Sequence, residues 1–150
     1  MRRPNSTKRK TCRVCGDALD EAHSRPNEYT GKHWPAGPVD AYISGQVILI
    51  TVNVWNAHGG HIQWRLCNDT TQETDNQACF DEHLLQIVSA RASNNKIIWN
   101  STYLGITTAQ GSLYVYADLT LPAGLACERY VLQFTYLGNK LASLIYNDNI

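Results

Sequence analysis

The amino-acid sequence predicts an all-β fold, an immunoglobulin-like (fibronectin-type) β-sandwich with long loops and one short helix. Two observations favour this fold class. Several separate runs alternate apolar and polar residues, which is the period of a strand with one buried face. Connections rich in glycine and proline punctuate these runs. The spacing from one run to the next is typical of a sandwich rather than a closed barrel.

The first 45 residues contain no such run. With 150 residues the chain has the length of one domain, which can bury a core without help from metals. Residues 1–11 are polar and basic and predict a disordered tail, so the domain is expected over residues 12–150. Residues 12–45 contain three prolines and four glycines with little periodicity, which predicts a long, structured loop region.

The central stretch, residues 47–67, organises the rest of the chain. Two alternating runs flank a short turn at residues 56–60, which predicts a β-hairpin with His58 at its tip. Gly59 and Gly60 supply the positive backbone dihedrals that a short connection needs, and they keep bulk away from the imidazole of His58. The residues expected to face the core are Ile48, Ile50, Val52, Val54, Ile62, Trp64 and Leu66.

The second half of the chain predicts one helix and three further strands. The helix is expected within residues 79–90, where Leu84, Leu85 and Val88 have helix-like spacing. Strands are expected at residues 96–103, although Asn100 and Ser101 interrupt that pattern, and at residues 113–121 and 130–136. Residues 113–121 alternate without a break, and a Pro-Ala-Gly turn follows them.

Charge and hydropathy limit the partners of the chain. Thirteen basic and thirteen acidic residues cancel, so no overall field favours nucleic acid or an anionic membrane. No apolar run approaches the roughly 20 residues of a membrane span, and the basic start is not followed by the apolar segment of a signal peptide. We therefore expect no nucleic-acid partner, no membrane partner and no signal peptide in the chain as written. We also expect the protein to be a monomer.

The cysteine content favours an oxidising compartment. All five cysteines are candidates for disulfide bonds, and their odd number leaves one thiol without a partner within the chain. Three glycosylation sequons, at Asn5, Asn68 and Asn100, agree with secretion. A bond between Cys67 and Cys79 would close a short loop and stabilise the fold by roughly 3 kcal/mol. The pairing of Cys12, Cys15 and Cys127 stays open.

Two other kinds of site, a zinc ribbon and a hydrolase centre, have their own sequence signatures. Cys12 and Cys15 can form half of a zinc site, with His23 and His33 or a later cysteine completing the four ligands. The basic tail would suit a nucleic-acid-binding ribbon. A second closely spaced cysteine pair is absent from the sequence, which disfavours the zinc ribbon. No Gly-x-Ser-x-Gly elbow, phosphate loop or His-Glu-x-x-His helix occurs, so the sequence does not support a hydrolase.

Several segments together resemble one family, the animal branch of the lytic polysaccharide monooxygenases. This is the fifteenth auxiliary-activity family, also catalogued as the type-four chitin-binding domain. The resemblance covers about 120 residues and keeps the order of the family's motifs. The similar segments are Thr11-Cys-Arg-Val-Cys-Gly-Asp17, Arg25-Pro-Asn-Glu28 with Gly31-Lys32, Ala57-His-Gly-Gly-His-Ile-Gln-Trp-Arg-Leu-Cys67, Cys79-Phe-Asp-Glu-His-Leu-Leu-Gln86, and Leu121-Pro-Ala-Gly124 with residues 127–134.

The resemblance implies a secreted copper oxidoreductase of carbohydrate metabolism. In this family one copper ion is held by the amino group and imidazole of an N-terminal histidine and by a second imidazole, a set suited to tetragonal Cu(II). The copper is reduced by an external electron donor, and crystalline chitin or cellulose is oxidised beside a glycosidic bond. His58 matches the second copper histidine.

The chain also departs from the family pattern, and we expect that pattern to be incomplete at both ends. It begins Met1-Arg2-Arg3 without the N-terminal histidine ligand, and the last strand, which carries an aromatic residue on the axial side of the copper, is not recognisable. Tyr130 stands where the family has a cysteine, which helps to account for the odd count. We therefore expect that the chain as written does not form the full copper site and that oxidative cleavage is impaired.

A second function of a different class follows from the aromatic residues of the long loop. Tyr29, Trp34 and Tyr42 can stack against sugar faces, which would suit a polysaccharide-binding module without catalysis. The same side chains can instead pack the loop onto the sandwich. Both interpretations stay open at the level of the sequence.

Overall fold

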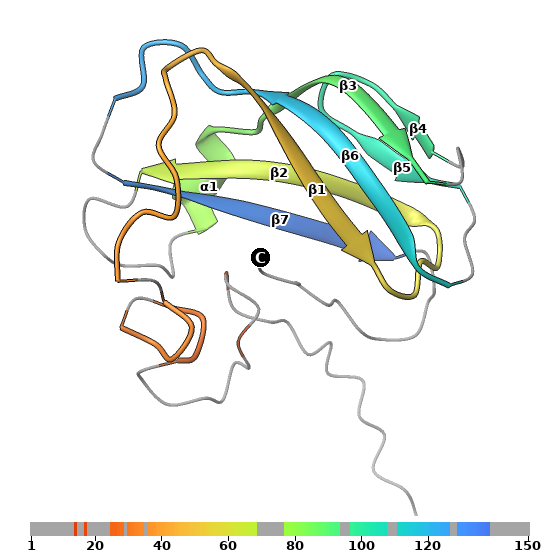
Figure 1. Cartoon of the computed structure of the whole chain (residues 1–150), viewed down its shortest axis with the longest axis horizontal. Helices are drawn as coiled ribbons and strands as arrows, with labels where there is room; N and C mark the ends of the chain where they lie inside the picture. Colours follow the sequence, from red (N-terminus) through yellow and green to blue (C-terminus); the bar gives the residue numbers. More distant parts are fainter. Residues whose placement is uncertain are drawn as a thin grey trace, which may run out of the picture.

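The computed structural model describes residues 14, 17, 25–28, 30–34, 36–68, 77–93, 97–107, 111–126 and 129–138. Within them the strands form two antiparallel sheets, a three-stranded sheet of order β1-β6-β3 and a four-stranded sheet of order β4-β5-β2-β7 (Figure 1). This arrangement confirms the predicted β-sandwich. The elements are β1 (Val47–Val54), β2 (Gly60–Asn68), α1 (Gln77–Glu82), β3 (Gln86–Ala92), β4 (Ile97–Trp99), β5 (Leu104–Ile106), β6 (Leu113–Thr120) and β7 (Tyr130–Gly138).

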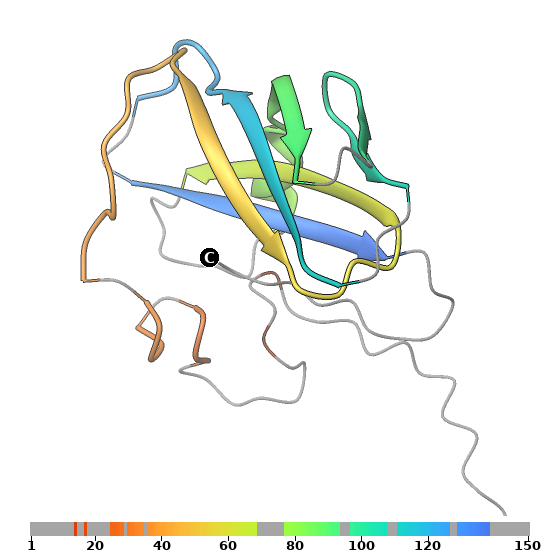
Figure 2. The same ribbon diagram turned by 45° about the vertical axis from the view of Figure 1, so that its right-hand side comes forward.

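The core lies between the two sheets and uses the alternation of the sequence. The β1–β6 pair crosses over the β2–β7 pair in both views of the molecule (Figures 1 and 2), and the inward faces of both pairs are apolar. Trp64 of β2 is almost fully buried, and its ring centroid lies 6.2 Å from that of Phe134 on β7. Six of the seven predicted core residues are buried, and Ile50 is half-buried against the same cluster.

The predicted hairpin at residues 47–67 is wrong. β1 pairs with β6 in the three-stranded sheet, whereas β2 pairs with β5 and β7 in the other sheet. The connection at residues 55–59 therefore crosses from one layer of the sandwich to the other. Alternation indicates which face of a strand is buried, but it does not indicate the neighbour to which the backbone hydrogen bonds go.

The predicted helix is also displaced. α1 spans only Gln77–Glu82, and Leu84 and Leu85 follow it in extended backbone. The amide of Leu85 donates to the carbonyl of Trp64 at 2.9 Å, so this segment borders β2 before β3 begins. Val88 is half exposed because it follows the buried Ile87 in β3 and so faces outward. The pairing of β3 with β6 is also irregular between Ile87 and Ser89. No helix in the described part of the chain is long and apolar enough to cross a membrane.

The remaining strand predictions hold with changed bounds. The run at residues 96–103 contains β4 only to Trp99, and Asn100 and Ser101 form the turn that leads to β5. β6 occupies the predicted run, and β7 continues beyond Tyr136 to Gly138. β7 is hydrogen-bonded to β2 along its whole length, from Tyr130 opposite Asn68 to Gly138 opposite Gly60.

The described parts of the long loop before β1 are held by polar contacts of the motif residues. Nη1 of Arg25 donates to both carboxylate oxygens of Glu28 at 3.0 and 2.8 Å, and both side chains are buried. The buried carboxylate of Asp17 accepts from the backbone amide of Asn27 at 3.2 Å and from its side-chain amide at 2.7 Å. These bonds agree with the predicted structured loop, and they give the family-like motif a structural role.

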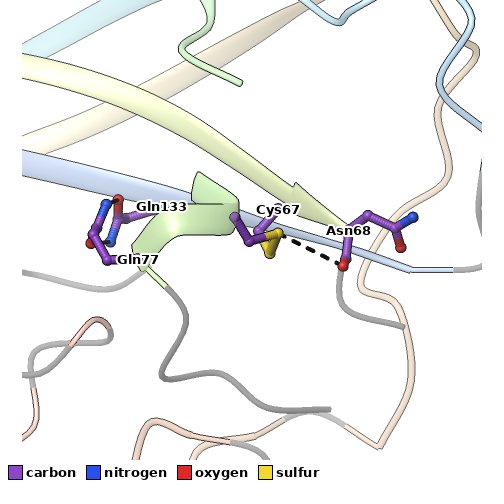
Figure 3. The surroundings of a disulfide bond; sticks show 5 residues. Cys67, Asn68, Gln77 and Gln133 are labelled. Carbon is purple, nitrogen blue, oxygen red and sulfur yellow. Dashed lines mark hydrogen bonds between the residues drawn. A yellow bond between two sulfur atoms is a disulfide. The ribbon is translucent and has the colours of Figure 1, made fainter. Parts of the chain in front are cut away.

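A disulfide bond joins Cys67 at the end of β2 to Cys79 in α1 (Figure 3). The Sγ atom of Cys79 also lies 3.9 Å from the carbonyl oxygen of Asn68. Beside the bond, Nε2 of Gln133 on β7 donates to Gln77 of α1 at 3.1 Å and to the carbonyl of Val14 at 3.0 Å. One of the candidate pairings is thus present, whereas Cys12, Cys15 and Cys127 lie outside the described residues.

Removing this disulfide is expected to lower the free energy of unfolding by roughly 3 kcal/mol, because the bond closes a loop of twelve residues in the unfolded chain. Urea denaturation of the Cys67→Ala/Cys79→Ala variant measures the loss. Either single alanine variant should lose about as much as the double variant, since each removes the same crosslink. A loss below about 1 kcal/mol would show that the bond constrains little.

Candidate functional site

The connection between β1 and β2 lies beside the end of β7 and the start of β6 (Figures 1 and 2). His58 belongs to this connection. Ala57, directly before it, is fully buried, and its amide donates to the carbonyl of Gly111 at 3.4 Å. His58 itself is exposed. The connection therefore presents an accessible imidazole next to a residue that is anchored in the core.

The hydroxyl of Tyr136 on β7 binds the backbone of this connection on both sides of the His58 residue. The amide of His58 donates to the Tyr136 hydroxyl at 3.0 Å, and this hydroxyl donates to the carbonyl of Gly59 at 2.6 Å. In the chain, His58 lies 78 residues before Tyr136, and Gly59 lies 77 residues before it. A strand of the opposite layer thus satisfies two polar groups that the turn leaves without a ladder partner.

Two glycines make the close approach to β7 feasible. Gly59 and Gly60 have φ values of 71° and 108°, which confirms the predicted positive dihedrals. A Cβ atom on Gly60 would lie 1.9 Å from the carbonyl oxygen of Leu137 on β7. Only glycine therefore allows β2 to begin so close to β7.

The described residues supply one candidate metal ligand at this turn. No group of three or more histidine, cysteine, aspartate or glutamate side chains in the described ranges is arranged to hold a metal ion. His61, three residues further along β2, stacks on Tyr103 with ring centroids 5.1 Å apart. An exposed imidazole on a fixed backbone fits the role of one nitrogen ligand in a tetragonal copper site.

The predicted zinc ligands are not brought together within this part of the chain. Cys67 and Cys79 are bonded to each other and so cannot complete a zinc site. His33 is exposed in the loop before β1. Cys12, Cys15 and His23 lie outside the described residues.

The two described aromatic residues that were predicted to bind polysaccharide, Trp34 and Tyr42, lie far from His58. Tyr42 precedes the start of β1, whereas His58 follows its end, so about 25 Å of strand separates them. Tyr42 is half exposed, and its hydrogen bond to Asp40 raises the pKa of its hydroxyl. Trp34 is partly buried, with the guanidinium of Arg129 at 5.6 Å from its ring centroid, just before the start of β7. Tyr29 lies outside the described residues.

Sequence reasoning missed two aromatic residues at the turn. Trp55 belongs to the same connection as His58, and 77% of it is exposed. Trp55 directly follows Val54, which was expected to face the core. Since successive residues of a strand face opposite sides, the alternation could have indicated that Trp55 points outward. No sequence signal could have assigned the hydroxyl of Tyr136 to the His58 turn, because the contact joins two distant strands.

Two of the three sequons lie at exposed positions. Asn68 ends β2 and Asn100 follows β4, and both are exposed. The side-chain oxygen of Asn100 accepts a hydrogen bond from the amide of Thr102 at 3.0 Å. Asn5 lies outside the described residues.

Comparisons with known proteins agree with the fold. A family model described as "Lytic polysaccharide mono-oxygenase, cellulose-degrading" matches residues 2–143. A solved AA15 lytic polysaccharide monooxygenase from Thermobia domestica, in the Cu(I) state, is 28% identical with a TM-score of 0.67. The match covers 84% of this chain and 60% of that chain, so this chain spans less than two thirds of its length. No curated protein sequence matches. Because the family model covers nearly the whole chain, this protein belongs to the lytic polysaccharide monooxygenase family.

Proposed function

We propose that this protein takes part in copper-dependent oxidative cleavage of crystalline chitin or cellulose, with His58 as a copper ligand. The observation that carries the proposal is the exposed imidazole of His58 on a backbone fixed to two layers of the sandwich. Members of the matched family depend on copper, and the similar solved structure is in the Cu(I) state. The similarity to that structure supports a place in the animal-type branch.

The residues of the turn would prepare the metal ligand before copper arrives. The hydrogen bonds around His58 limit the directions in which its side chain can leave the backbone, which reduces the ordering that metal binding must impose. When bound, copper supplies the redox chemistry that activates oxygen or peroxide toward the polysaccharide. Within the described residues His58 is the one candidate ligand at this turn, and the resemblance assigns the other nitrogen ligands to an N-terminal histidine.

Trp55 would supply a surface for the polysaccharide beside His58. Its indole is largely exposed and belongs to the same short connection. Aromatic rings bury large apolar area against flat partners, and the faces of sugar rings are such partners. This placement puts a sugar-stacking ring within a few residues of the proposed copper ligand.

Secretion and glycosylation belong to the same proposal. The Cys67–Cys79 disulfide suits an oxidising compartment, and insoluble polysaccharide is an extracellular substrate. The exposed Asn68 and Asn100 are the proposed glycosylation sites within the described residues. An external electron donor would act as the partner that keeps copper reduced.

The His58→Ala variant is expected to lose copper affinity by about a hundredfold or more, because even residues that only orient metal ligands contribute 10–100-fold. Isothermal titration with Cu(II) and mass spectrometry of oxidised oligosaccharides from chitin and from cellulose, with ascorbate as reductant, measure both effects on the secreted, processed protein. His61→Ala is the matched control, since His61 lies on β2 and stacks on Tyr103. Equal copper affinity in the wild type and in His58→Ala would exclude His58 as a ligand.

A polysaccharide-binding module without catalysis is the second candidate, and the exposure of Trp55 and Tyr42 favours it. Sedimentation with insoluble chitin and with cellulose in the absence of reductant measures binding alone. Retention on the polysaccharide, together with no oxidised products when copper and reductant are added, would support this function over the enzyme. Loss of retention in Trp55→Ala, with Tyr42→Ala as the comparison, would show which end of the sandwich binds.

A further inference from the structure

The hydroxyl of Tyr136 both donates and accepts a hydrogen bond in the turn that carries His58. A phenol hydroxyl has one proton to donate, and Tyr136 donates it to the carbonyl of Gly59 at 2.6 Å. The same oxygen accepts the amide proton of His58 at 3.0 Å. The ring is itself fixed, because it packs against the hydrophobic core from its place on β7.

Without these bonds the turn would have little to hold its shape. Gly59 lies between His58 and Gly60, the first paired residue of β2, and glycine has the largest conformational freedom of any residue. The anchor on the other side is the amide of Ala57, which reaches Gly111 only at 3.4 Å. The Tyr136 hydroxyl is the contact that binds the His58 peptide group itself.

We propose that Tyr136 is a positioning residue for His58, fixing through its hydroxyl the direction in which the imidazole leaves the turn. This inference rests on the proposed role of His58 as a copper ligand. Tyr136 acts on the backbone and not on the metal: it holds the amide of His58 and the carbonyl of Gly59 from β7, so that the imidazole is oriented before any metal binds.

The test replaces Tyr136 by phenylalanine, which keeps the ring in the core and removes only the hydroxyl. In metal-free protein, the amide of His58 is expected to exchange its hydrogen at least tenfold faster in Tyr136→Phe, as measured by NMR. The Kd for Cu(II) is expected to rise at least tenfold, and the Cu(II) EPR spectrum to change, while the thermal unfolding midpoint stays within a few degrees of the wild type. Tyr116→Phe is the matched control, because Tyr116 lies on β6 under the guanidinium of Arg91, and it should change none of these quantities.

The outcomes separate this inference from the proposed function. If His58→Ala loses copper affinity but Tyr136→Phe binds copper like the wild type, Tyr136 does not position the ligand and the inference is overturned, while the proposed function stands. An unchanged exchange rate at the His58 amide would overturn it as well. If His58→Ala binds copper like the wild type, the proposed function itself fails, whatever Tyr136→Phe does.

Discussion

Replacing Gly60 by alanine is expected to lower the free energy of unfolding by about 3–5 kcal/mol, a large part of the stability of a domain of this size. The new Cβ atom would lie 1.9 Å from the carbonyl oxygen of Leu137 and 2.8 Å from the Cα atom of Gly138. Both are backbone atoms of β7 and cannot rotate away, so β2 and β7 would have to separate at this end. The φ of 108° adds strain for any residue with a side chain.

Two other glycines separate the contributions of contact and backbone strain. Gly124 has a φ of 80° but open space around its position for a Cβ atom, so Gly124→Ala should cost only about 1–2 kcal/mol. Gly37 has open space and no positive φ, so Gly37→Ala should change stability by less than about 0.5 kcal/mol. Urea denaturation of the three variants gives the ranking. If Gly60→Ala were no less stable than Gly124→Ala, the close approach of β2 to β7 would not be a constraint.

Replacing Arg25 by methionine is expected to cost about 3–5 kcal/mol, because it removes the cation that pairs with the buried carboxylate of Glu28. The two side chains expose only 5% and 11% of their surface, and the contacts are 3.0 and 2.8 Å. The turn at residues 28–31 would loosen as well. Glu28 belongs to this turn, and its carbonyl accepts a hydrogen bond from the amide of Gly31 at 2.7 Å. Denaturation curves and hydrogen exchange at Gly31 measure the global and the local effect.

The double variant Arg25→Met/Glu28→Leu tests the reason for that loss. Removing both charges should restore a large part of the stability, because a buried ion pair often contributes little net free energy compared with apolar residues of similar volume. Arg91→Met is the matched control: Arg91 is exposed, with its guanidinium 4.7 Å from the ring centroid of Tyr116, and its loss should cost at most about 1 kcal/mol. Equal losses in Arg25→Met and Arg91→Met would contradict the expected importance of burial.

The fold class and most of the core could be predicted from the sequence alone. The alternation in β1 and β2 is local and has the period of a pleated strand, so it predicted that Ile48 and Trp64 face inward without knowledge of their partners. The two glycines after His58 predicted positive φ values, because no other residue adopts them freely. The order of the motifs indicated a lytic polysaccharide monooxygenase, and the family model confirms this broader family.

The pairing of the strands and the surroundings of His58 could not be predicted from the sequence and are seen only in the tertiary structure. The apolar pattern of β1 and β2 suits a hairpin as well as a crossover between layers, and the choice depends on backbone hydrogen bonds to β6 and β7. The helix-like spacing of Leu84, Leu85 and Val88 did not produce a helix there. Hydrogen bonds with the β2 backbone and the pairing of β3 with β6 hold this segment extended. Tyr42 and Trp34 were separated from His58 by the length of the strands, whereas Tyr136 was brought to it from 78 residues away. Such contacts follow from the packing of two layers, and a local pattern of residue types carries no information about them.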